Sequence, residues 1–191
     1  MEKEVKLKDG SEVLVRDLNS NDVEKSFAFF QKLPVEDRIY LRVDVTKKEN
    51  VEKRIKIMNY QRVKRLSAFY NNEIVADGAL ELEGHGWKEH TAELRLIVAE
   101  DFRRKGLGII LAGELFNLGL KEGVEEILVK MMKPQAAAQS IFHRLGFHHD
   151  IVLSNYVKDQ SGKKQDLIIM RCSLKDLWEE LEDYFHEKDY R

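Results

Sequence analysis

The sequence predicts a mixed α+β fold in which a mostly antiparallel, twisted sheet with one parallel strand pair is flanked by helices. Two apolar runs separated by Asn71 and Asn72 predict an antiparallel hairpin, because asparagine tolerates the positive φ of tight hairpin turns. A strand, a glycine-rich turn, a helix and a second strand follow between residues 93 and 129, which is the order of a βαβ unit. The length of 191 residues suits one sizeable core, so we expect a single domain over residues 1–191.

The first predicted strand covers residues 12–16, after a turn at Gly10. A helix follows, because Asn19 can cap it, Asp22 falls at its third position and Pro34 stops it. The sequence beyond this proline is less regular.

A second helix is predicted from Thr46, because residues 46–49 have capping-box spacing. Its apolar stripe consists of Val51, Ile55 and Met58. The hairpin strands then cover residues 66–70 and 74–82, and another strand covers residues 93–98.

The helix after the glycine-rich turn is predicted from its apolar face, which consists of Ile109, Leu111, Ala112, Leu115, Phe116 and Leu120. Residues 125–129 read as the returning strand. A further helix runs from Pro134 to Leu145 and is stopped by Gly146.

Phe147 opens another predicted strand, and residues 167–170 form a buried one. An amphipathic helix capped by Ser173 is expected at about residues 173–188. Its apolar face either covers the sheet or packs on a partner chain, as in a homodimer.

Composition excludes several classes of protein. The formal charge of −2, from 32 basic and 34 acidic residues, is too balanced for electrostatic binding to nucleic acid. No apolar run is long enough to span a membrane, and we see no signal-peptide core. Cys172 is the one cysteine, which excludes an internal disulfide and favours a cytoplasmic location. His148-His149-Asp150 does not predict a metal site, because neighbouring strand residues face opposite sides.

The glycine-rich turn is where we expect the chemistry. A strand that ends in a tight turn and leads into a helix leaves backbone N–H groups unpaired, and the helix dipole makes them an anion site. Gly106 and Gly108 let a phosphate approach the backbone, and positive charge is added by Arg103, Arg104 and Lys105. These residues indicate a phosphorylated cofactor, and the alternative is an ordinary glycine turn with a solvated basic rim.

Spacing excludes two other phosphate-binding motifs. The dinucleotide fingerprint requires a third glycine where this chain has Leu111. The P-loop requires Gly-Lys-Ser/Thr, whereas Lys105 precedes Gly106 and Ile109 follows Gly108.

The sequence over about residues 93–147 resembles the GNAT superfamily of N-acetyltransferases. The family's pyrophosphate motif, Arg/Gln-x-x-Gly-x-Gly/Ala, is matched by Arg103, Gly106 and Gly108 directly after a strand. Its Tyr-x-x-Leu-Gly-Phe pattern is matched by residues 142–147 except at the tyrosine. The resemblance implies the GNAT fold, whose parallel strand pair splays apart, with acetyl-CoA as cofactor and a primary amine as acceptor.

The resemblance also implies site residues. Backbone groups of Leu96, Ile97 and Val98 would pair with the pantetheine arm of acetyl-CoA, much as an added strand pairs with a sheet edge. Glu93 stands where many members carry a glutamate that accepts the amine's proton directly or through water, and the alternative is an exposed strand-edge glutamate. The other cofactor-binding positions that the resemblance implies are Arg103, Arg104, Lys105, Gly106, Leu107, Gly108, Ile109, Gln135 and Phe142.

Two of these positions depart from the family pattern. Phe142 replaces the tyrosine that usually protonates the departing thiolate, so the general acid is unassigned. Gln135 replaces a common asparagine but keeps an amide. His143 points about 100° away from Phe142 on the helix, which favours a surface position, and nothing supports Tyr156 as the acid.

Segments within residues 7–42 resemble the opening of bacterial protein-lysine acetyltransferases, which favours a protein lysine over a small-molecule amine. A polyamine acceptor would require carboxylates in the cleft, for which the candidates are Glu81, Glu83 and Glu93. A third interpretation, favoured by Phe142, is a non-catalytic acyl-CoA sensor.

Overall fold

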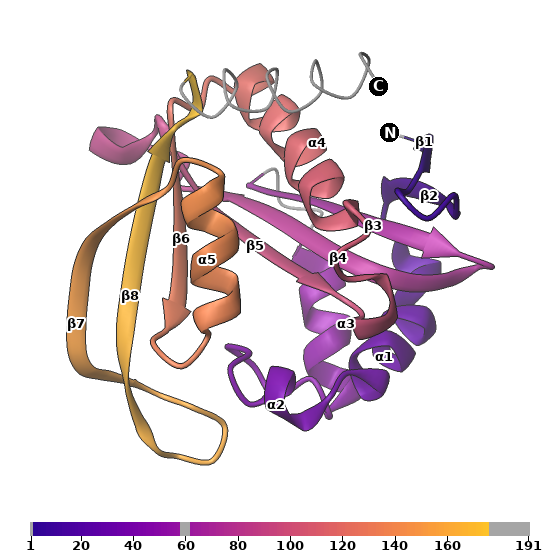
Figure 1. Ribbon diagram of the computed structural model, residues 1–191, viewed down its shortest axis with the longest axis horizontal. Coiled ribbons are helices and arrows are strands. Elements are labelled where there is room, and N and C mark those ends of the chain that lie inside the picture. Colours follow the sequence, from indigo (N-terminus) through magenta and orange to yellow (C-terminus); the bar gives the residue numbers. More distant parts are fainter. Residues whose placement is uncertain (1, 58–61, 176–191) are drawn as a thin grey trace.

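The computed structural model describes residues 2–57 and 62–175. Its strands form one eight-stranded sheet in the order β1-β2-β3-β4-β5-β6-β8-β7 (Figure 1). All neighbours are antiparallel except β5 and β6, which are parallel, so the predicted sheet is confirmed. The strands are β1 (Glu2–Lys6), β2 (Glu12–Asp17), β3 (Val63–Tyr70), β4 (Glu73–Leu82), β5 (Thr91–Val98), β6 (Glu126–Met132), β7 (His148–Lys158) and β8 (Lys164–Ser173).

The described helices are α1 (Val23–Lys32), α2 (Val35–Arg38), α3 (Lys48–Ile57), α4 (Leu107–Lys121) and α5 (Ala136–Arg144). Short 3-10 turns are η1 (Ser20–Asp22), η2 (Gly86–Lys88) and η3 (Glu100–Phe102). The predicted turn chemistry is confirmed at Asn71 and Asn72, with φ of 47° and 65°, and at Gly146, with φ of 80° just beyond α5.

Three expectations need correction. β1 was not predicted, because its polar sequence pairs only with β2 at a charged sheet edge. α2 lies in the stretch that we expected to be irregular. The Thr46 hydroxyl donates to Asp44 instead of capping a helix, and α3 begins two residues later, at Lys48.

The predicted final helix lies mostly outside the described residues. Ser173 is the last residue of β8, and only the first helical residues, Leu174 and Lys175, are described. Met58, at the end of the α3 stripe, is also outside the described part.

Helices cover both faces of the sheet (Figure 1). α4 and α5 contribute to one apolar core, and α4 lies so close that a Cβ on Gly78 of β4 would be 2.7 Å from Leu115 Cδ1. α1 and α3 form a second core on the other face, which includes Phe30 and Val51. This second face also carries every other residue of β5, from Glu93 to Ile97.

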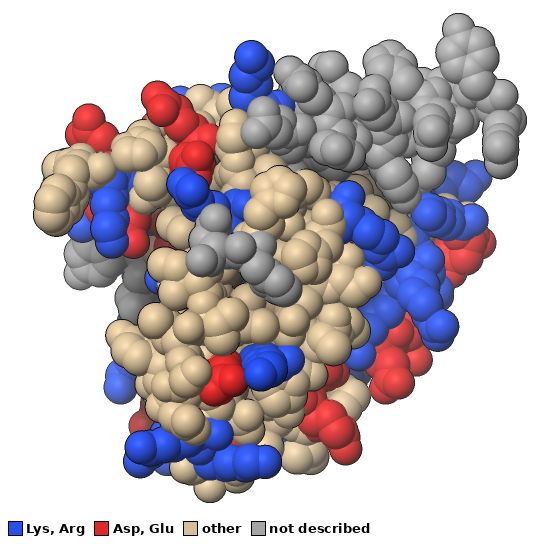
Figure 2. Space-filling model, turned by 60° about the vertical axis from the view of Figure 1, so that its left-hand side comes forward, with Lys and Arg blue, Asp and Glu red and all other residues tan. Residues whose placement is uncertain are grey.

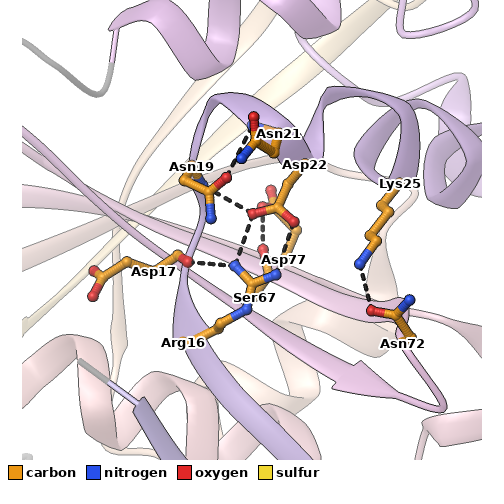
Figure 3. Close-up of polar contacts among 9 residues, drawn as sticks. All are labelled: Arg16, Asp17, Asn19, Asn21, Asp22, Lys25, Ser67, Asn72 and Asp77. Atoms are coloured by element: carbon orange, nitrogen blue, oxygen red, sulfur yellow. Dashed lines mark hydrogen bonds and ion pairs between the residues drawn. The ribbon is translucent and has the colours of Figure 1, made fainter.

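Arg16 of β2 holds the start of α1 (Figure 3). Its guanidinium donates two hydrogen bonds to Asp22, at 2.7 and 2.8 Å. Asp22 also accepts from the Asn19 N–H at 2.9 Å, while the Asn19 side chain accepts from the Asn21 N–H at 2.9 Å. The predicted cap at Asn19 is therefore confirmed, and the hydrogen bonds from Arg16 lower the pKa of Asp22.

Asp77 of β4 is a buried acid that joins α3 to the sheet. It accepts from Arg65 at 2.6 Å, Arg54 at 2.9 Å and Ser67 at 3.1 Å, and Figure 3 shows the contact with Ser67. Burial alone would raise the pKa of Asp77, but the two positive charges and these hydrogen bonds outweigh it, so the pKa lies below its usual value.

The face that carries β7 and α5 turns forward in Figure 2 and is largely uncharged. Ile141, Ile151 and Val152 are exposed there, each by 44–52%. The homodimer stays a prediction. Within residues 2–57 and 62–175, no helix is both long and apolar enough to cross a bilayer.

Candidate active site

β5 and β6 form a fork in the sheet. Their parallel pairing covers only Thr91–Glu93 and Glu126–Leu128. Beyond it β5 continues to Val98 beside β4, while β6 continues to Met132 beside β8. The edges that face each other therefore part after Glu93, and the predicted backbone edge at residues 96–98 lies on one arm of the fork.

The glycine loop lies between β5 and α4. Gly106 is the N-cap of α4 with φ of 88°, and Arg104 before it has φ of 60°. The first helical hydrogen bond in α4 runs from the Ile110 N–H to the Gly106 carbonyl, at 3.1 Å. The N–H groups of residues 107–109 precede this bond, and a glycine cap has no side chain to occupy them. With the dipole of a 15-residue helix behind them, they suit an anion such as a pyrophosphate.

The basic side chains of the loop contact acids that the sequence analysis did not identify. Arg103 donates to the Val98 carbonyl at 3.0 Å and to Asp37 of α2. Lys105 lies 2.8 Å from Asp9, and this hydrogen bond, followed by one from the Ser11 N–H, lowers the pKa of Asp9 to about 2. Arg103 and Lys105 are thus partly neutralised, and both Arg103 and Arg104 are exposed.

The turn between β1 and β2 supports the glycine loop from outside. The Lys8 N–H donates to the Lys105 carbonyl at 3.1 Å. Side-chain carbons of Lys8 lie 3.7 Å from the position that a Cβ on Gly106 would take. No local sequence signal indicates this contact, because residues almost one hundred positions apart form it.

Glu93 lies at the vertex of the fork and is 6% exposed, so the alternative of an exposed strand-edge glutamate is wrong. Its Oε2 accepts from Lys130 of β6 at 2.8 Å, and its Oε1 accepts from Arg42. Arg95 Nε is 3.6 Å from the same Oε1. Arg42, Arg95 and Lys130 are not among the site residues that the sequence predicts.

Gln135 is the N-cap residue of α5, and Phe142 lies within this helix. The Gln135 side chain accepts from the Met132 N–H at 2.8 Å, which closes the turn between β6 and α5. The Phe142 ring packs edge-on against Phe147 at 5.2 Å, so this position holds an apolar contact. His143 Nδ1 lies 3.1 Å from the Phe147 carbonyl, and Tyr156 is 67% exposed.

The open side of the fork is bordered by two segments that are distant in sequence. Gln160, in the turn between β7 and β8, donates from its backbone to the Ile39 carbonyl at 2.9 Å and from its side chain to the Leu41 carbonyl at 2.7 Å. A hollow of about 340 Å³ adjoins this contact and includes Arg38 and Val45 in its lining. Residues 39–44 also carry Arg42 to the vertex.

Comparisons with known proteins agree with this geometry. The family model described as "Acetyltransferase (GNAT) family" matches residues 29–147. The chain is 27% identical to "[Ribosomal protein bS18]-alanine N-acetyltransferase" of Escherichia coli K12 over 115 residues, which are 59% of this chain and 69% of that relative.

Solved structures show the same fold. The GNAT domain of S. lividans PAT has a TM-score of 0.74 at 16% identity, covering 90% of this chain and 96% of that one. A putative acetyltransferase from Salmonella typhimurium, solved with acetyl-CoA, has a TM-score of 0.72 at 18% identity and covers 86% and 95%. A fork beside a glycine-capped helix is thus found where the family model also matches, and the chain belongs to the GNAT family of acetyltransferases, whose cofactor is acetyl-CoA.

Proposed function

We propose that this acetyltransferase transfers acetyl to the α-amino group of a polypeptide. The proposal rests on the fork between β5 and β6, whose vertex holds Glu93 and its cations. The N-terminus of α4, which follows β5, suits the cofactor. The relative that acetylates a ribosomal-protein alanine supports an α-amine. A protein lysine is the second candidate, because the amino-terminal segments resemble lysine acetyltransferases.

The chain's residues fit acetyl-CoA. The N–H groups of Leu107, Gly108 and Ile109 would hold its pyrophosphate, with Arg104 adding charge. The edge at residues 96–98 would pair with its pantetheine arm, although the Val98 carbonyl already accepts from Arg103. When bound, this cofactor supplies an activated acetyl group.

Glu93 is the candidate proton acceptor. An amine attacks only in its neutral form, and an α-amine with a pKa of about 8 is mostly charged at pH 7. A carboxylate at the vertex can accept its proton through water, because each oxygen has more lone pairs than the contacts occupy. Phe142 has no proton to give, so coenzyme A would leave as the thiolate, and catalysis would depend on how the two reactants are oriented.

Acetyl-CoA turnover with defined peptides tests the acceptor. We expect thiol release with a peptide that has a free α-amine and no lysine, and a mass increase of one acetyl group at its first residue. A matched peptide with a blocked α-amine and one lysine should be a poor substrate. Release with the lysine peptide alone would contradict the proposal and support the second candidate.

A further inference from the structure

Three cations contact two carboxylates at the vertex of the fork. Besides the contacts of Glu93 with Arg42 and Lys130, Arg95 donates to Glu81, its neighbour on β4. The Glu93 side chain is 8% exposed, whereas the side chains of Arg42, Arg95 and Lys130 are 32–41% exposed. The Glu93 carboxylate therefore lies deeper than the three cations, whereas the Glu81 side chain is 31% exposed.

The cluster carries one positive charge more than its carboxylates neutralise. Its described neighbours are Arg54, Arg65, Asp77 and Glu83, which add two charges of each sign and leave this excess unchanged. Among the described residues, no hydrogen-bond partner is found for the buried Nε of Arg95. This buried Nε lies 3.6 Å from Glu93 Oε1, so what the cluster offers a ligand is its excess positive charge.

The cations also disfavour one another. Burial and then the charge of Arg95 lower the pKa of Arg42 to about 10. Burial and then the charge of Arg42 lower the pKa of Lys130. An anion bound among them would relieve this repulsion, and a guanidinium matches a carboxylate with two parallel hydrogen bonds.

The position of the cluster connects it to the reaction. Arg95 and Lys130 each lie two residues beyond the last β5–β6 pair, one on each arm of the fork. Both are on the face opposite α4, and Arg42 reaches them from the segment that borders the open side. The three cations therefore lie beside Glu93, where the two arms of the fork part.

We propose that Arg42, Arg95 and Lys130 form a carboxylate-binding subsite that selects a substrate with a carboxylate near its reacting group. The inference rests on the proposed function, because the substrate that carries the carboxylate is either the acceptor or the acyl-CoA of that reaction. The carboxylate belongs either to an acidic residue beside the acceptor amine or to the distal end of the acyl chain. Either source supplies the same ligand chemistry.

Paired substrates distinguish the two sources. With acetyl-CoA, we compare lysine-free tripeptide amides that begin with Asp or Asn, and with Glu or Gln. An acceptor carboxylate should raise kcat/KM at least tenfold for the acidic members. With the Asn peptide, a tenfold preference for succinyl-CoA over acetyl-CoA would place the carboxylate on the acyl chain instead.

Variants tie the preference to the cations. Arg95→Gln and Lys130→Met should each reduce the acidic-to-amide ratio of kcat/KM to below threefold. Lys32→Gln is the control, because it removes a positive charge from an exposed pair with Glu73 on α1 and β4, outside the cluster. The subsite would be overturned if kcat/KM were equal for acidic and amide peptides and also for succinyl-CoA and acetyl-CoA. It would also be overturned if the variants kept the preference of the unaltered protein.

A binding measurement does not depend on turnover. Succinate titrated into the CoA-loaded protein by calorimetry should bind saturably, and at least tenfold more weakly in Arg95→Gln. If none of the peptides is acetylated, the proposed function fails, yet the titration still decides the subsite. Saturable binding lost in the variant supports it, and undetectable binding to the unaltered protein refutes it.

Discussion

Glu93 shows how surroundings set the role of a single residue. A glutamate in an alternating strand is compatible with a solvated edge, but here β6 and residues 39–44 bring a lysine and an arginine onto its two oxygens. The carboxylate both anchors cations and is available to accept a proton through water. A change at this residue therefore affects charge as well as chemistry.

Glu93→Gln should lower kcat about 10²-fold at pH 7, the lower end of the range for general-base catalysis. The deficit should shrink as pH rises towards 9, because more of the α-amine is then already neutral. Thiol-release rates from pH 6 to 9 measure this change. Glu126→Gln is the control, because Glu126 pairs with Arg171, at 3.6 Å, and not with the cations at the vertex. Equal kcat in Glu93→Gln and the unaltered enzyme across this pH range would remove the proton-accepting role.

At the scale of elements, α4 and the loop before it act as one unit. The loop requires left-handed backbone at Gly106, and the first free N–H groups of α4 follow from that turn. The β1–β2 turn contacts the same loop through Lys8 and Asp9. The predicted cofactor loop is thus held by the β1–β2 turn, an element that the glycine motif does not indicate.

Gly106→Ala should weaken acetyl-CoA binding at least tenfold, because alanine at φ of 88° costs about 1–3 kcal/mol and shifts the loop. Calorimetric titration with coenzyme A measures the loss. Gly123→Ala is a matched control, because Gly123 has φ of 76° beyond the other end of α4, where a Cβ meets no atom within 4 Å. The control should lose stability and keep its affinity. Equal affinity in both variants would show that the loop does not hold the cofactor.

At the scale of the whole molecule, buried charge links the helical layer to the sheet. Asp77 on β4 joins Arg65 on β3 to Arg54 on α3, and Arg54 is buried enough that its pKa falls to about 10. Because the folded-state pKa of Asp77 lies below its unfolded value, its contribution to stability is present above about pH 4. It is lost as pH falls through the folded-state pKa.

Asp77→Asn should lower the free energy of unfolding at pH 7 by about 3–5 kcal/mol, since two arginines lose their buried partner. The difference from the unaltered protein should narrow below about pH 4, because the unfolded chain then binds a proton at Asp77 that the folded protein does not yet bind. Urea unfolding at several pH values measures both effects. Glu73→Gln breaks an exposed pair with Lys32 and should change stability far less. A difference independent of pH would contradict the assigned ionisation.

The sequence alone determined the antiparallel hairpin, the cap at the start of the first helix and the glycine loop, because Asn71-Asn72, Asn19 and Gly106 act on their own backbone. These are local effects that follow from φ and from hydrogen bonds within a few residues. It did not predict β1, whose polar residues form a strand only because β2 pairs with them.

Only the tertiary structure decided which charges meet at the fork. Arg42 and Lys130 are 51 and 37 residues away from Glu93, and Asp9 lies far along the chain from the Lys105 that it binds. Side-chain charge interacts through space, so its partners depend on strand order and on where loops cross the sheet. The family and its cofactor were thus readable from the sequence, whereas the electrostatics that we expect to select the substrate were not.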